Sequence, residues 1–158
     1  MRDIYKSKIG NILIESDGKN IIKCEFVDYF VEQGIDEIIE KCKNYLDDYF
    51  SGKITGQFGD ILIDKSDYPT KIFKLVCEIP YGTTATYTDI KEKYEKIYNL
   101  KTSARAVGRA VGSNDLMILV PCHRVIGKNN TLTGYKFGIE KKKYLLDLEQ
   151  NHKSSVNI

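Results

Sequence analysis

Long apolar stretches are missing from this sequence, and so is an N-terminal segment typical of a secretory signal. No apolar run approaches the roughly 20 residues that cross a bilayer, and the opening MRDIYKSKIG has no uninterrupted apolar core. We therefore expect a cytoplasmic protein without membrane contact. Its 158 residues, 42% hydrophobic and 29% charged, suffice for one ordinary domain or two small ones that share a core.

Metal-ligating residues are also scarce. The chain has two histidines and four cysteines, and Cys24, Cys42, Cys77 and Cys122 form no CxxC pair. This pattern argues against a disulfide framework and against a four-ligand zinc site. We expect reduced thiols, no metal and no cofactor, with three of the cysteines filling core space.

Arginine is rare, and its distribution is uneven. Lysine supplies 20 of the 24 basic residues, yet three of the four arginines are Arg105, Arg109 and Arg124. The charge is uneven as well: residues 1–70 hold 9 Lys or Arg against 14 Asp or Glu, and residues 71–158 hold 15 against 8. A basic second half fits a solvated surface or a polyanionic partner equally well. The forked, planar guanidinium suits insertion among bases and phosphates or pairing with carboxylates.

The first part of the chain predicts an α/β domain over residues 1–68. Residues 9–28 alternate apolar and polar side chains around Asp17-Gly18, which indicates a hairpin. Apolar positions, Tyr49 among them, recur at helical spacing over 34–50, with Gly52 just beyond. The sequence DILID at 60–64 predicts a strand before the boundary region at Pro69.

The second part, residues 69–158, predicts mostly helices. A helix over 70–79 ends at the PYG sequence, and Thr86 with Asp89 resembles a capping box that opens the next helix. A third helix would begin after Ser103 as N-cap and close with Gly112 as C-cap. Two short helices joined by a brief turn suggest a helix-turn-helix.

The last helix, over 138–151, should turn Tyr144, Leu145 and Leu148 inward and leave its lysines in solvent.

The third helix, SARAVGRAVG, has mostly small side chains, and only its arginines have long ones. Each glycine inside a helix costs about 1 kcal/mol, so Gly108 and Gly112 need a compensation. Close packing on a neighbouring element and docking in a narrow minor groove would each supply one.

The stretch ILVPCHRVI at 118–126 carries the strongest chemical signal. Ile118, Leu119 and Val120 predict a buried strand that ends at Pro121, directly before Cys122 and His123. A thiol becomes nucleophilic when a cation or base lowers its pKa, and His123 could act as that base. Because neighbouring side chains in an extended segment point to opposite faces, their contact would need a bend or a bridging water.

These residues carry a family resemblance. PCHRVIG, preceded by IPYGTTATYTDI and SARAVGRAVGSN and followed by TGYKFGIEKKKYLLDLE, resembles the O6-alkylguanine-DNA alkyltransferases over residues 70–150. The resemblance implies an N-terminal ribonuclease H-like α/β domain packed on a mostly α C-terminal domain with a winged-helix-like helix-turn-helix. It also implies single-turnover, irreversible repair of O6-alkylguanine, and of O4-alkylthymine, in duplex DNA bound through the minor groove by a monomer.

The resemblance further assigns the catalytic residues. Cys122 would be the alkyl acceptor, activated through a water by His123, whose other nitrogen Glu149 would hold. Asn114 would fix the turn that places the Cys122 loop. Tyr87 would lie in the base pocket, where it would donate a proton or hydrogen bond to the extruded nucleotide or rotate its phosphate.

Base-pocket and DNA contacts are implied in the same way. Val125 and Lys136 would contact the guanine through backbone groups, and Tyr135 would line the pocket. Arg105 would replace the flipped guanine in the stack, because a base must leave the duplex before its O6 can be reached. The other implied DNA-contacting positions are Ser103, Ala104, Ala106 and Gly108.

Two other classes remain open. One is a DNA-binding module without catalysis, either a transcription regulator or an alkyltransferase-like lesion sensor; the sensors lack the acceptor cysteine, which is present here as Cys122. The other is a cysteine hydrolase, which is disfavoured because no glycine run for an oxyanion hole accompanies the thiol.

Overall fold

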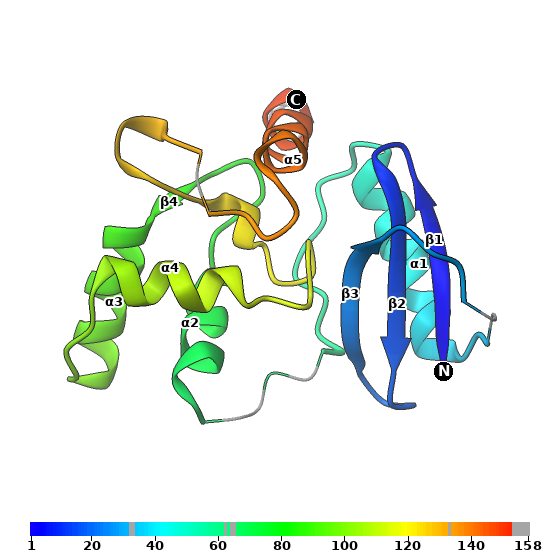
Figure 1. Cartoon of the computed structure of the whole chain (residues 1–158), viewed down its shortest axis with the longest axis horizontal. Coiled ribbons are helices and arrows are strands. Elements are labelled where there is room, and N and C mark those ends of the chain that lie inside the picture. The colour runs from blue at the N-terminus through cyan, green and yellow to red at the C-terminus, as the bar shows by residue number, and fades with distance from the viewer. Residues whose placement is uncertain (32–33, 62, 64–65, 133, 153–158) are drawn as a thin grey trace.

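The computed structural model describes residues 1–31, 34–61, 63, 66–132 and 134–152. A small antiparallel sheet with one helix lies on one side of the molecule, and a group of helices lies on the other (Figure 1). None of the helices in these described ranges is both long and apolar enough to cross a membrane.

The N-terminal sheet has the order β1-β2-β3, with β1 at Arg2–Ser7, β2 at Gly10–Ser16 and β3 at Ile21–Val27, all antiparallel. The predicted hairpin is confirmed, because the Asp17 amide donates to the Asn20 carbonyl at 3.1 Å across the β2–β3 turn. Gly18 lies there at φ +95°, a conformation that glycine adopts without strain. Strand β1 was not predicted.

Helix α1, at Glu37–Phe50, covers the sheet with its apolar face. Its start lies three residues after the predicted one, because the Asp36 side chain accepts from the Ile39 amide and caps the helix. Gly52 follows the end at φ +88°, as predicted. The predicted strand at 60–64 is reduced to one bridge between Ile61 and Ile21 among the described residues, and positions 62 and 64 lie outside them.

Three short helices, α2 at Tyr68–Val76, α3 at Tyr87–Tyr98 and α4 at Ala104–Gly112, pack on one another in the second part. The Thr86 capping box and the Ser103 N-cap are both confirmed, so α3 and α4 begin where the sequence predicts. The prediction that Gly112 caps α4 is wrong. Gly112 is the last helical residue, and Ser113 takes the C-cap without a left-handed conformation.

The remaining elements surround the Cys122 stretch. They are the short parallel pair β4 (Ala85–Thr86) and β5 (Val125–Ile126), two 3-10 turns, η1 (Cys122–Arg124) and η2 (Lys128–Asn130), and α5 (Ile139–His152).

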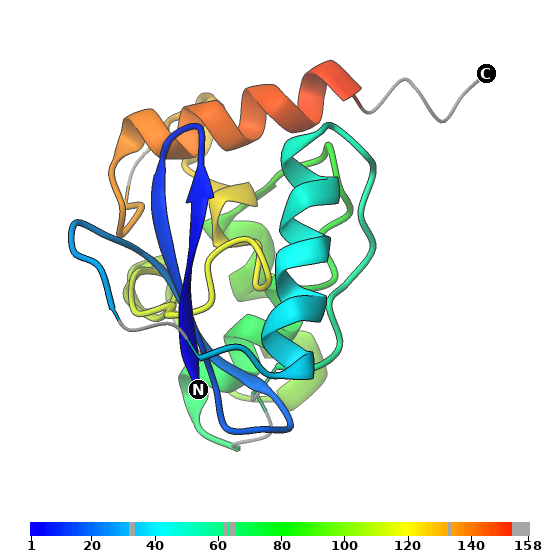
Figure 2. The same cartoon turned by 90° about the vertical axis from the view of Figure 1, so that its right-hand side faces the viewer.

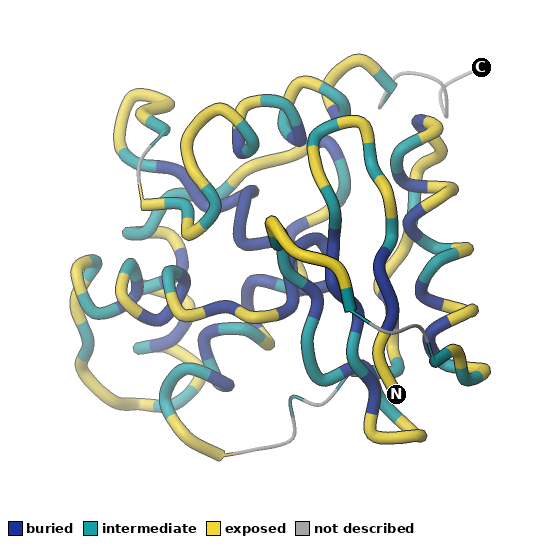
Figure 3. Tube along the Cα trace, turned by 45° about the vertical axis from the view of Figure 1, so that its right-hand side comes forward, coloured by how far each residue is buried: buried dark blue, intermediate teal, exposed yellow. Residues whose placement is uncertain are grey.

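Helix α5 joins the two parts of the molecule. It crosses above the second part, and its C-terminal end lies over the C-terminal end of α1 (Figure 2). The His152 ring there occupies the space beside Gly52. Buried apolar residues from both parts form one continuous core, seen as the dark segments that meet in the centre of Figure 3.

Candidate active site at the Cys122 turn

A buried turn, and not a strand, leads into Cys122. The prediction of a strand at Ile118–Val120 is wrong, because Ile118 adopts φ +67° and Met117 bridges back to Val120. The predicted burial is correct for all three residues. An apolar run indicates burial, but it does not distinguish a strand from a tightly curled segment.

Asn114 holds this turn closed. Its side-chain amide donates to the Val120 carbonyl at 3.1 Å, and its Oδ1 accepts from the Leu116 amide at 2.9 Å. Asn114 is itself buried. The side chain therefore lies where the resemblance had assigned it, at the turn that positions Cys122.

The Cys122 thiol is buried, with 2% of the residue exposed. Burial raises the pKa of this thiol well above its usual range, and the positive charge of Lys142 and a hydrogen bond with Asn114 only partly oppose that effect. The expected lowering of the Cys122 pKa by its neighbours is thus absent in the free protein. The thiol is kept protonated until a base removes the proton.

His123 lies beside it on the same 3-10 turn and is fully buried. Its Nε2 is 2.5 Å from Glu149 Oε2, whereas its Nδ1 is buried without a hydrogen-bond partner among the described residues. Burial lowers the pKa of His123 despite the neighbouring carboxylate. A neutral ring with its proton on Nε2 therefore presents a lone pair at Nδ1.

Glu149, from α5, is the most heavily hydrogen-bonded side chain of the site. Its Oε1 accepts from Arg124 Nε at 2.8 Å and from the Gly82 amide at 3.1 Å, and its Oε2 accepts from the Tyr49 hydroxyl at 2.7 Å. Burial alone would raise the pKa of Glu149, but hydrogen bonds from His123 and Arg124 hold it at about 2. The carboxylate is therefore ionised at every physiological pH.

Two of these partners were missed by sequence reasoning. Arg124 was noticed only as a rare arginine, yet it is buried and also donates to the Ile79 carbonyl at 2.8 Å. Its rarity in a lysine-rich chain was a usable signal, since guanidinium suits bidentate pairing with a carboxylate. Tyr49 had been assigned only to the apolar face of its helix.

Lys142 corrects another expectation. It was placed with the solvated lysines of α5, but it is fully buried, and its Nζ donates to the Val125 carbonyl at 2.6 Å. Burial lowers the pKa of Lys142 to about 8. Its Nζ also lies 5.9 Å from the centre of the Tyr87 ring. A cation thus stands among the residues assigned to the base pocket.

Tyr87 begins α3 and lies between α4 and the loop that precedes α5. Its ring faces Gly108, and its hydroxyl lies 3.1 Å from where a Cβ at Gly134 would stand. Tyr135, in the same loop, is half-buried, and its hydroxyl has no partner among the described residues. The Lys136 side chain turns outward to Asp115 at 2.5 Å.

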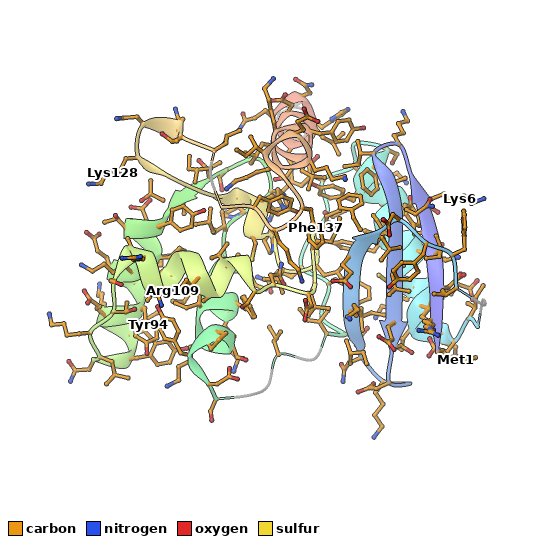
Figure 4. The ribbon with its side chains drawn as sticks, in the orientation of Figure 1. Met1, Lys6, Tyr94, Arg109, Lys128 and Phe137 are labelled. Atoms are coloured by element: carbon orange, nitrogen blue, oxygen red, sulfur yellow. The ribbon has the colours of Figure 1, made fainter. Side chains whose placement is uncertain are left out.

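The face of α4 assigned to DNA is partly open to solvent. Arg105 and Ser103 are exposed, and Ala104, Ala106 and Gly108 are half-exposed. Arg109 and Lys128 lie at the end of the molecule opposite Met1 and Lys6 (Figure 4). A Cβ at Gly108 would meet only the Tyr87 ring, at an ordinary 3.8 Å, so packing inside the protein does not require glycine there.

Comparison with known proteins gives matches to both parts of the chain. The family described as "6-O-methylguanine DNA methyltransferase, ribonuclease-like domain" matches residues 1–62, and the one described as "6-O-methylguanine DNA methyltransferase, DNA binding domain" matches residues 67–151. The methylated-DNA–protein-cysteine methyltransferase of Methanosarcina barkeri is 36% identical over 157 residues, 95% of this chain and 97% of that protein. The inducible Bacillus subtilis protein of the same name is 38% identical over 123 residues, 78% of this chain and 66% of that protein.

Solved structures agree. The O6-methylguanine methyltransferase of Mycobacterium tuberculosis matches with a TM-score of 0.82 at 30% identity, covering 96% of this chain and 93% of that one. A structure of the M. tuberculosis protein in complex with DNA matches equally well. The predicted ribonuclease-like α/β domain followed by a mostly helical DNA-binding domain is thereby confirmed.

Proposed function

This chain belongs to the 6-O-methylguanine DNA methyltransferase family, and we propose that it removes alkyl groups from guanine O6 in double-stranded DNA by transferring them to Cys122. The observation that carries the proposal is the line of buried groups from Cys122 through His123 to Glu149. The buried thiol precedes a buried base in the sequence, and that base contacts an ionised carboxylate away from solvent.

The reaction forms one bond and breaks one. The Cys122 sulfur attacks the alkyl carbon, the C–O6 bond breaks, and its electron pair goes to the purine. The thiol proton passes to His123 Nδ1, through a water if the two side chains do not touch, and Glu149 stabilises the imidazolium that forms. The purine gains a proton in turn, so that normal guanine and a thioether are the products.

Two further residues suit the charge that develops. The Tyr87 hydroxyl can donate to the purine as negative charge builds on it. The Lys142 cation favours the thiolate during attack, because opposite charges attract strongly away from water. Tyr135, Val125 and Lys136 would bound the base pocket.

We assign DNA binding to α4, which would enter the minor groove. We further propose that the protein acts as a monomer and is cytoplasmic. The small residues Ala104, Ala106 and Gly108 would permit close approach, and Arg105 would fill the stack that the flipped guanine leaves. The basic character of residues 71–158 supports a polyanionic partner.

Peptide mass spectrometry tests the proposal directly. After incubation with duplex DNA containing O6-methylguanine, the peptide with Cys122 should gain one methyl group. The Cys122→Ser variant should bind the same duplex within a few-fold of the unaltered protein and gain no methyl. Methylation at another cysteine, or none at all, would overturn the assignment.

A further inference from the structure

A hydrogen bond from the N-terminal domain reaches the proposed proton relay, which consists of Cys122, His123 and Glu149. Tyr49, on α1, is fully buried, and its hydroxyl lies 2.7 Å from Glu149 Oε2 and 3.3 Å from His123 Nε2. We propose that Tyr49 is a positioning residue, which keeps Glu149 Oε2 against His123 Nε2 and so leaves His123 Nδ1 as the proton acceptor. The effect on alkyl transfer rests on the function proposed above.

The hydroxyl is the feature that apolar packing does not explain. The other buried positions of α1 are Ile39, Cys42 and Leu46, and a phenylalanine at position 49 would continue that face. A buried hydroxyl without a partner costs about 1–3 kcal/mol. Here both partners of the hydroxyl, Glu149 and His123, belong to the relay. Among the described residues of the range 1–62, Tyr49 is the one that hydrogen-bonds to them.

The two oxygens of Glu149 are held differently. Arg124 Nε and the Gly82 amide both donate to Oε1, whereas the contact of Arg124 with Oε2 is longer, at 3.2 Å. The close contacts of Oε2 are therefore Tyr49 and His123. Without the Tyr49 hydroxyl, His123 would remain as the close donor to Oε2, so the carboxylate would be oriented less firmly while its charge stayed beside the imidazole.

The protonation state of Tyr49 determines which group donates in its contact with Glu149. Burial, together with the adjacent Glu149 charge, raises the pKa of Tyr49 well above its usual range, so the group remains a phenol. Its single proton goes to Glu149 Oε2, which is the shorter contact, and is not available to His123 Nε2. That nitrogen must then carry its own proton, which fixes the tautomer with the lone pair on Nδ1.

Without the hydroxyl, His123 should be held less strictly in one tautomer. Glu149 should become a stronger base, because it loses a hydrogen-bond donor. A more basic Glu149 stabilises the imidazolium, so the pKa of His123 should rise in Tyr49→Phe. Because transfer needs neutral His123, the acid limb of the rate profile should move to higher pH. Transfer should slow about ten-fold, less than the 10²–10⁴ that a general base itself supplies.

Nitrogen-15 NMR of the imidazoles provides a readout that does not depend on transfer. The full chain has only two histidines, and His152 serves as internal reference. We expect one Nε2–H tautomer at His123 in the unaltered protein and a mixture in Tyr49→Phe. Tyr45→Phe is the matched control, because Tyr45 lies one turn earlier on α1 and donates to the Gly56 carbonyl at 2.6 Å.

A double variant separates positioning from packing. If Tyr49 acts through Glu149, Tyr49→Phe should slow transfer no further when Glu149→Gln is already present. Equal slowing in both backgrounds, or a His123 tautomer and pKa like those of Tyr45→Phe, would overturn the proposal. Failure of the unaltered protein to methylate Cys122 would instead reject the proposed function and leave the NMR result standing.

If Tyr49→Phe does not fold, 3-fluorotyrosine placed at position 49 keeps the shape and makes the hydroxyl a stronger donor. The pKa of His123 should then fall, opposite to the effect of phenylalanine. An unchanged His123 pKa with fluorotyrosine would reject the proposal.

Discussion

Lys142 Nζ donates a 2.6 Å hydrogen bond to the Val125 carbonyl, and this bond fixes a buried cation against the strand that follows the Cys122 turn. The lysine is fully enclosed, whereas Lys143, its neighbour on α5, is exposed and lies 3.7 Å from Asp147. One helix thus presents adjacent lysines to two different environments.

We predict that Lys142→Met slows alkyl transfer about ten-fold or more, because attraction between opposite charges in a protein is on the order of 1–4 kcal/mol. The difference should shrink above pH 8, since the pKa of Lys142 is about 8 and the unaltered protein loses its cation there. Transfer rates from pH 6 to 10 provide the measurement. Lys143→Met is the control and should behave like the unaltered protein; a constant ratio across this range would contradict the prediction.

The burial of Lys142 also shows where sequence reasoning stops. Local signals predicted the Asp17-Gly18 turn, the Thr86 capping box and the Ser103 N-cap, because each depends on residues within four positions of one another. The environment of Lys142 depends on elements that meet only in the folded chain, and helical periodicity alone cannot distinguish a buried lysine from a solvated one.

The same limit applies to the candidate site. Cys122 and His123 were identifiable from the sequence, and the resemblance supplied Glu149. Tyr49 was not, since 74 residues separate it from His123 and 100 from Glu149. Its apolar ring at helical spacing predicted a core residue, which is correct for the ring but not for the hydroxyl.

Glu149 should make stability depend on acid pH. Its pKa falls from 4.5 to about 2 on folding, so its contribution is present above pH 4.5 and is lost as pH falls toward 2. That shift corresponds to about 3 kcal/mol at neutral pH. Denaturant unfolding of Glu149→Gln should therefore show a deficit at pH 7 that narrows below pH 4.5 and closes near pH 2. A deficit that stayed constant with pH would mean that packing, and not charge, is lost.

Arg105 should matter only when a base must leave a stack. For Arg105→Ala we predict a loss of about ten-fold or more in transfer from duplex O6-methylguanine, and little change with free O6-benzylguanine, since extrusion costs a few kcal/mol. Arg109→Ala removes the same charge from the same helix. This variant should weaken only the electrostatic, salt-dependent part of duplex binding. Equal losses on both substrates would make Arg105 a structural residue.

The product left on Cys122 determines how many times the protein can act. Attack on an alkyl carbon gives a thioether, which, unlike a thioester, offers water no electrophilic carbonyl. We therefore predict about one product per protein molecule, seen as a burst without a steady state when methylated duplex is in excess.

The spent protein should also be less stable than the fresh one. Cys122 is 2% exposed, on a turn closed by buried Asn114, so an added methyl group has little free space. Overpacking of this kind costs about 1–3 kcal/mol, and thermal melting of the methylated protein should occur several degrees lower. Cys122→Ser, treated with the same DNA, should melt unchanged. Many products per molecule, with no loss of stability, would reject single-turnover transfer and favour a cysteine hydrolase.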